Sequence, residues 1–126
     1  MIDHISVAVQ DLKVGTDFYR LVFAPLGLTL LVEREKTSGF GKKYPEFWLN
    51  VRPAMKPMAD DHGTHICLRA PSIHAVTEFH DVALMEGGKS DGAPGERQAA
   101  MTTYFGAFIL DPFGNKIEAV CFPKST

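Results

Sequence analysis

Two histidines and one glutamate have the residue types and the placement expected of metal ligands. His4 and His65 each open a segment of alternating apolar side chains, and Glu118 lies in a similar segment near the end of the chain. The alternation predicts strands in which these residues lie on the face opposite the apolar one, away from a packed helix. Two curled sheets with helices outside would direct all three side chains into one concave surface. Two imidazoles and a carboxylate there form a facial metal site for Fe or Mn, with Zn, Ni or Co as alternatives.

A competing metal pair consists of His62 and His65, three residues apart. Gly63 between them predicts a turn, and only Asp60 and Asp61 offer carboxylates nearby. This pair is therefore the weaker hypothesis. The sequence has no nucleophile motif, glycine-rich phosphate loop or paired-cysteine motif that would compete with a metal site.

The remaining histidines and both cysteines are expected to have structural roles. His74 and His80 lie six residues apart on a predicted helix and point to different sides, so both are expected to be exposed. Cys67 and Cys121 are too few for a disulfide scaffold. They are interpreted as buried thiols of a reducing compartment.

Hydrophobic patterning divides the chain into the elements that must position these side chains. It predicts strands at residues 1–9, 28–33, 47–51, 65–69, 104–110 and 116–122. Asp11 caps a helix that Pro25 and Gly27 end, and Ser72 caps a second helix over residues 73–86. Residues 38–41 predict a turn with a short strand around it, and residues 89–97 predict a polar loop rich in glycine and proline.

The predicted pattern occurs twice. A shift of 61 residues superposes four identities at a strand start, a helix face and a helix end: His4 on His65, Ile5 on Ile66, Phe18 on Phe79 and Gly27 on Gly88. We therefore expect an α+β fold in which two βαβββ modules form curled mixed sheets around a cavity, with the helices outside. The chain would be a single domain, residues 1–126, with modules at residues 1–53 and 62–126 and a linker at 54–61.

The composition is that of an ordinary globular protein. Hydrophobic residues make up 45%, and 13 basic against 15 acidic side chains give a net charge of −2. Spread along the chain, these charges predict no binding to nucleic acid or to an anionic membrane surface. The apolar runs are far shorter than the roughly 20 residues of a membrane span, and no secretory signal opens the sequence. We therefore expect a cytoplasmic protein.

Several segments resemble the vicinal oxygen chelate superfamily of glyoxalases, bleomycin resistance proteins and extradiol dioxygenases. They are residues 1–7, 11–12, 17–19, 63–66 and 111–118, and the last (Asp-Pro-Phe-Gly-Asn-Lys-Ile-Glu) is the most specific. The resemblance covers essentially the whole chain. It implies paired βαβββ modules around a divalent metal that holds two adjacent oxygens of a small-molecule substrate. It places His4, His65 and Glu118 on ligand positions, and it implies a homodimer, in which modules of some members pair across chains.

Two positions depart from the best-known members of this superfamily. Glyoxalase I-like proteins carry a further acidic ligand and base where this sequence has Trp48, although Glu46 lies two residues away on the same face. An indole neither binds a metal nor takes a proton. Extradiol dioxygenases carry an acid/base tyrosine where this sequence has Phe108, and Tyr104 on the same strand face is the candidate replacement.

The same face supplies candidate substrate-binding residues. Trp48, Tyr104 and Phe108 would line the cavity and favour a flat or apolar substrate, unless they only fill the barrel. Arg52 and Arg69 fall on the inward-facing side of the strand alternation and could pair with a substrate carboxylate, unless they lie in solvent at strand ends. We therefore expect a metal-dependent enzyme, a lyase, isomerase or dioxygenase, with a catalytic role for Tyr104 and Glu118. The alternatives are a metal-free antibiotic-binding protein and a lactoylglutathione lyase-like enzyme.

Overall fold

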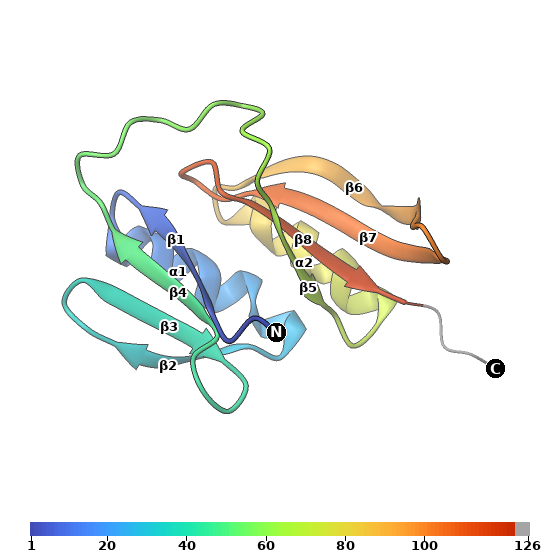
Figure 1. Ribbon diagram of the computed structural model, residues 1–126, viewed down its shortest axis with the longest axis horizontal. Coiled ribbons are helices and arrows are strands. Elements are labelled where there is room, and N and C mark those ends of the chain that lie inside the picture. Colours follow the sequence, from blue (N-terminus) through green and yellow to red (C-terminus); the bar gives the residue numbers. More distant parts are fainter. Residues whose placement is uncertain (123–126) are drawn as a thin grey trace.

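The computed structural model describes residues 1–122 and has two four-stranded mixed sheets, each with one helix. In chain order the elements are β1 (Ile5–Val9), α1 (Leu12–Val22), the 3₁₀ helix η1 (Ala24–Leu26), β2 (Thr29–Glu33), β3 (Thr37–Gly41), β4 (Phe47–Val51), β5 (Ile66–Arg69), α2 (Ile73–Met85), β6 (Lys89–Gln98), β7 (Thr103–Leu110) and β8 (Lys116–Cys121). The first sheet has the strand order β1-β4-β3-β2, and the second sheet has the order β5-β8-β7-β6. The α+β fold with two βαβββ modules is confirmed, and neither sheet closes into a barrel (Figure 1).

The two sheets share one pairing scheme. The first strand of each module pairs in parallel with the last, β1 with β4 and β5 with β8, and the other neighbours are antiparallel. A parallel pair needs a long crossover connection, and the helix of each module is part of it. Each helix therefore covers one face of its own sheet and leaves the other face open (Figure 1).

Both predicted N-caps are confirmed. The Asp11 carboxylate accepts a hydrogen bond from the backbone N–H of Val14 at the start of α1, and the Ser72 hydroxyl accepts one from Ala75 at the start of α2. These side chains satisfy N–H groups that the first helical turn leaves without a partner. Gly27 ends η1 with φ of 79°, a left-handed conformation that favours glycine.

One hydrophobic core joins the modules. α1 buries Phe18 and Val22, and α2 buries Val76, Phe79 and Ala83, all in a single cluster that includes the covered faces of both sheets. The two helices contact one another behind the sheets (Figure 1). Removal of this apolar surface from water is the main force that holds the modules together.

A buried polar link also crosses between the modules. Tyr19 on α1 donates a 2.6 Å hydrogen bond to the carboxylate of Asp111, in the turn between β7 and β8. The amide of Asn115 donates to the same carboxylate and to the carbonyl oxygen of Ala8 on β1. Burial raises the pKa of both Tyr19 and Asp111, whereas the hydrogen bonds to Asp111 act to lower its pKa. The turn before β8 is thereby tied to the first module.

The prediction of a loop at residues 89–97 is wrong, because these residues lie in the ten-residue strand β6. β6 is an edge strand, so its outer side has no neighbouring strand. Pro94 is tolerated there because no such strand needs the backbone N–H that proline lacks. Its pairing with β7 shifts register between Ser90 and Gly92 and again between Gly92 and Gly95. These bulges accommodate the glycines and the proline that suggested a loop.

The turn predicted at residues 38–41 is also displaced. These residues lie in β3, and the chain reverses at residues 34–36 instead. Ser38 faces α1 and shares a 2.8 Å hydrogen bond with Thr16, and Gly39 leaves room for the ring of Trp48. Close packing on both faces explains small residues within a strand.

Three further side chains differ from expectation. His80 is buried at 6% exposure, because its Nε2 lies 2.7 Å from the hydroxyl of Ser90 on the unpredicted strand β6. Cys67 is exposed and Cys121 is half-buried, so neither is the buried thiol that was expected. His74 is exposed, as predicted.

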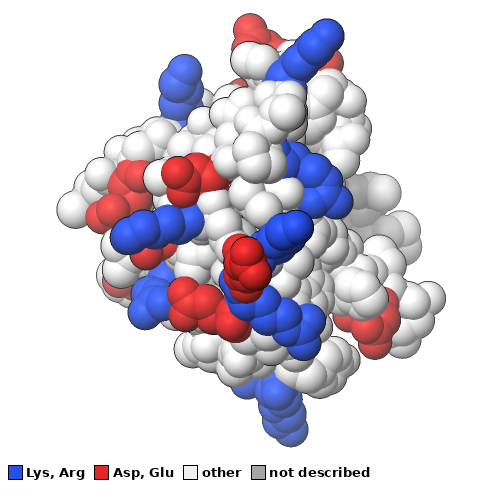
Figure 2. Space-filling model, turned by 90° about the vertical axis from the view of Figure 1, so that its left-hand side faces the viewer, with Lys and Arg blue, Asp and Glu red and all other residues white. Residues whose placement is uncertain are grey.

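The helices and the charged surface agree with a globular domain. Within residues 1–122, no helix has the length and apolarity that crossing a membrane requires. On the face shown in Figure 2, basic and acidic side chains are interspersed. On α1, Lys13 and Asp17 lie on successive turns and form an ion pair, with their charged groups 2.7 Å apart.

Candidate functional site

The open face of the second sheet, opposite α2, carries most of the predicted site residues. The strand register aligns Cys67, Glu118, Phe108 and Gly92 in one row across β5, β8, β7 and β6. Residues paired across neighbouring strands share a face of the sheet. Ile117 and Ala119, on either side of Glu118, are fully buried toward α2. The carboxylate of Glu118 therefore lies on the open face.

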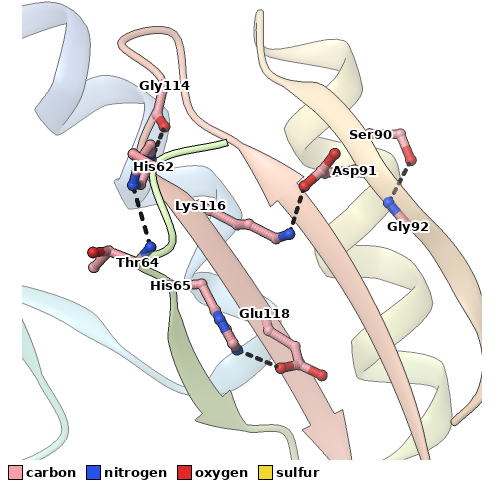
Figure 3. Close-up of polar contacts among 9 residues, drawn as sticks. All are labelled: His62, Thr64, His65, Ser90, Asp91, Gly92, Gly114, Lys116 and Glu118. Atoms are coloured by element: carbon pink, nitrogen blue, oxygen red, sulfur yellow. Dashed lines mark hydrogen bonds and ion pairs between the residues drawn. The ribbon is translucent and has the colours of Figure 1, made fainter. Parts of the chain in front are cut away.

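His65 and Glu118 are brought together by the parallel pairing of β5 with β8. His65 immediately precedes β5, and its Nε2 lies 3.1 Å from Oε1 of Glu118 (Figure 3). The carboxyl side chain of Glu118 is 5% exposed, whereas the imidazole of His65 is 44% exposed. A nearly buried carboxylate thus has an accessible imidazole as its neighbour.

Tyr104 on β7 contacts the second oxygen of the same carboxylate. Its hydroxyl donates a 3.0 Å hydrogen bond to Oε2 of Glu118. Gly106 makes this approach possible, because a Cβ at that position would lie 2.9 Å from the Tyr104 ring and 3.3 Å from Oε2. Desolvation, and then the hydrogen bond and charge of Glu118, raise the pKa of Tyr104, which keeps the phenol protonated.

Phe108 forms an apolar surface beside this group. Its ring packs edge-on against His65, with ring centroids 5.5 Å apart. The ammonium group of Lys116 lies 4.9 Å from the Phe108 ring centroid and 2.8 Å from a carboxylate oxygen of Asp91 (Figure 3). The site therefore combines a carboxylate, an imidazole and a phenol with an aromatic wall.

Two residues of the open face were missed by sequence reasoning. Cys67 is the register partner of Glu118, and desolvation and the Glu118 carboxylate raise the pKa of its thiol to about 12. Arg97 is the register partner of Tyr104. The strand alternation of residues 65–69 contained the signal for Cys67, whereas Arg97 was hidden in the segment predicted as a loop.

His4 does not join His65 and Glu118. Its Nδ1 lies 2.7 Å from the carboxylate of Asp3, and its side chain is 54% exposed. β1 and β5 run in opposite directions, so the start of β1, next to His4, and the start of β5 lie at opposite ends of the two sheets (Figure 1). Among residues 1–122, no three His, Cys, Asp or Glu side chains converge as a metal site would require.

The predicted substrate-binding residues are divided between the sheets. Trp48 lies on the open face of the first sheet, with its ring against Gly39 and the guanidinium of Arg34 5.6 Å from its centroid. Arg52 is exposed beyond β4 and donates to its own neighbour's carbonyl. Arg69 lies on β5, with its guanidinium 5.0 Å from the Phe122 ring centroid.

The donor set of the second sheet fits two ligands of a divalent metal. An imidazole nitrogen and a carboxylate suit Fe, Mn, Zn, Ni and Co ions. The contact between His65 and Glu118 brings the two donors close enough to share one ion. Tyr104 holds the other carboxylate oxygen, and such a hydrogen bond orients a metal-ligating carboxylate.

Comparison with solved structures places this fold among known proteins. A glyoxalase/bleomycin resistance protein from Albidiferax ferrireducens is 27% identical, with a TM-score of 0.84 over 94% of this chain and 97% of that one. A fosfomycin resistance protein from Listeria monocytogenes is 16% identical, with a TM-score of 0.69 over 98% and 93% of the two chains. A glyoxalase I variant from Zea mays is 18% identical, with a TM-score of 0.72 over 94% and 44%. The two lower identities show a shared fold alone.

Sequence comparison gives the family directly. No curated protein matches this sequence. A family model described as the glyoxalase/bleomycin resistance protein/dioxygenase superfamily matches residues 1–119. This chain therefore belongs to the glyoxalase/bleomycin resistance protein/dioxygenase superfamily.

Proposed function

We propose that this protein is a metal-dependent enzyme for a small substrate that chelates a divalent ion through two adjacent oxygens. The observation that carries the proposal is the contact between His65 and Glu118 on an open sheet face, within a chain of this superfamily. These two residues would hold the ion. When bound, it would act as a Lewis acid toward a substrate oxygen.

The third ligand, His4, would come from a second copy of the chain. Within one chain the residues before β1 and β5 lie at opposite ends of the sheets, which argues against a site made by one chain alone (Figure 1). β1 and β5 are also the edge strands of their sheets, so each has one side without a neighbouring strand. A homodimer in which the first sheet of one copy faces the second sheet of the other would unite His4 with the pair. A twofold axis would form two such sites.

Tyr104 would be the acid/base group. Its phenol stays protonated and donates its one O–H hydrogen bond to Glu118. If that O–H turned from Glu118 to the substrate, it would give a hydrogen bond or a proton to a substrate oxygen beside the ion. Phe108 would contact the apolar part of the substrate and exclude water from it. In the dimer, Trp48 of the other copy would face the same space. Trp48 supplies no carboxylate, which argues against lactoylglutathione lyase chemistry.

Metal analysis tests the proposal. The purified protein, reconstituted separately with Fe, Mn, Co, Ni and Zn ions, is expected to retain about one ion per chain. His65→Ala and Glu118→Gln should each lower metal affinity by about 10-fold or more. His74→Ala, a change at an exposed histidine, is the matched control and should bind normally.

Two results would contradict the proposal that this protein is a metal-dependent enzyme. One is a wild-type protein that holds less than about 0.2 ion per chain after every reconstitution. The other is unchanged metal content in the His65 variant. The first result would favour a metal-free binding protein, in which the aromatic side chains of the two open faces enclose a small molecule.

A further inference from the structure

The side chain of Arg97 is held by hydrogen bonds on the open face of the second sheet. It lies on β6 opposite Tyr104, past the two bulges that distort the start of this strand. Its guanidinium donates to the backbone carbonyl oxygens of Glu96 and Ala93. These two bonds hold the planar group in one place although its side chain belongs to an edge strand.

Two glycines leave the space that this guanidinium occupies. A Cβ at Gly95 would lie 3.2 Å from Nη1 of Arg97, and a Cβ at Gly92 would lie 3.3 Å from Nη2. Neither glycine has a positive φ, so the backbone does not require glycine at these positions. The absence of side chains instead leaves the space that the guanidinium occupies, and a Cβ at Gly92 would also lie 3.0 Å from the Phe108 ring.

Arg97 has no acidic partner in the described part of the chain. Among the Lys and Arg side chains of residues 1–122, only Lys13 and Lys116 form ion pairs, with Asp17 and Asp91, and Arg97 is one of the others. A guanidinium has five N–H donors, and two backbone carbonyls do not satisfy them all. The remaining donors are available to a ligand.

The position of Arg97 relates it to the proposed active site. Arg97 is the register partner of Tyr104, whose hydroxyl donates to Glu118, and Phe108 lies four residues further along the same strand face. An oxyanion at Arg97 would therefore lie beside Tyr104 and Phe108. Because a guanidinium fork matches the two oxygens of such a group, the contact would both bind and orient the ligand.

We propose that Arg97 binds an oxyanion group of the substrate, so that the substrate is a small organic acid with a carboxylate or phosphonate next to an apolar part. This inference rests on the proposed function in one respect, the assignment of the open face as the substrate site. The binding of the oxyanion by Arg97 itself requires no metal. Arg97 is a specificity-determining residue that selects an anionic over a neutral substrate.

The experiment uses simple probes and chelator-treated protein, so that a missing metal cannot be confused with a missing anion site. Titration calorimetry with phenylacetate and phenylphosphonate is compared with neutral phenylacetamide. We expect millimolar or tighter binding of the anions, and affinity for the amide lower by about tenfold or more. The two anions reveal whether carboxylate or phosphonate is preferred.

The variants locate the binding group. Arg97→Gln should weaken phenylacetate binding by about tenfold or more, and Arg97→Lys should retain charge but recover only part of the affinity. Arg20→Gln, at an exposed position of α1, is the control and should bind as the wild type does. Thermal unfolding of each variant verifies that the fold is unchanged.

Four outcomes would overturn the proposal. The first three are equal affinity for the acid and the amide, unchanged anion affinity in Arg97→Gln, and absence of millimolar anion binding by the wild type. The fourth is loss of binding in Arg69→Gln alone, which would assign the anion to the other arginine of the sheet. Failure of metal binding in the parallel reconstitution would leave these results intact and would count against the proposed function only.

Discussion

His65 and Glu118 are 53 residues apart in the chain, and Nε2 of one lies 3.1 Å from Oε1 of the other. The contact follows from the module itself, because the crossover through α2 brings β8 back in parallel beside β5. The side-chain alternation of both strands then directs the pair to the face that α2 does not cover. The same register places Cys67, Phe108 and Gly92 in one row with Glu118 across the four strands.

The first prediction concerns the polar link between the modules. Tyr19→Phe removes the hydroxyl that donates to the buried carboxylate of Asp111 and changes little else. We expect a loss of about 1–3 kcal/mol in the free energy of unfolding, because a buried acceptor loses a partner. Tyr44→Phe changes an exposed tyrosine and serves as the control in the same urea titration. Equal stability of the two variants would refute a stabilising role for this link.

The second prediction concerns Gly106. Its φ is not positive, so an alanine is compatible with the backbone, but the added Cβ would meet the Tyr104 ring at 2.9 Å. Gly106→Ala should displace Tyr104 from Glu118 and lower stability by about 1–3 kcal/mol. In Gly95→Ala the nearest atom is the end of the longer Arg97 side chain, which can move, so the loss should be smaller.

NMR of tyrosine-labelled protein gives the direct measurement for the Gly106 variant. The Tyr104 ring signals should change in Gly106→Ala, and those of the buried Tyr19 should not. Unchanged Tyr104 signals would show that the glycine is not what permits the contact with Glu118.

The third prediction concerns pH and His80. Burial lowers the pKa of His80 below 6.5, and the neighbouring Asp81 opposes this effect only in part. The unfolded chain therefore takes up a proton at a higher pH than the folded protein does. Stability from this residue is complete above pH 6.5 and is lost as the pH falls from there toward the lower pKa of the folded state.

His80→Gln removes this titration and keeps a group that can bond to Ser90. The free energy of unfolding should decrease less between about pH 7.5 and 5.5 in the variant than in the wild type. Exposed histidines titrate similarly in both proteins and cancel in the comparison. Parallel pH curves would mean that His80 is protonated as readily in the folded state as in the unfolded one.

The local sequence pattern was sufficient to predict the two modules and part of the candidate site. The alternation around Glu118 and the helix caps at Asp11 and Ser72 are local signals, and the structure agrees with them. β6 was missed because its glycines and Pro94 are tolerated only by bulges and by an edge position, which depend on tertiary structure. Arg97 was missed along with it.

The packing of one module on the other could not be predicted from the local sequence pattern. Strand alternation predicts that His4 and His65 each lie on the face of the sheet opposite the helix. It does not give the antiparallel course of β1 and β5, which separates the two histidines within one chain (Figure 1). That course depends on the contact between α1 and α2 and on the link from Tyr19 to Asp111.

The most direct test of the shared site is complementation between two defective chains. His4→Ala and His65→Ala proteins should each bind little metal alone. When they are mixed, unfolded and refolded together, half of the dimers are mixed, and each has one intact site and one that lacks both histidines. We predict recovery of about one quarter of the wild-type metal content. A mixture that binds no more metal than its separate components would contradict a site built from His4 of one chain and His65 and Glu118 of another.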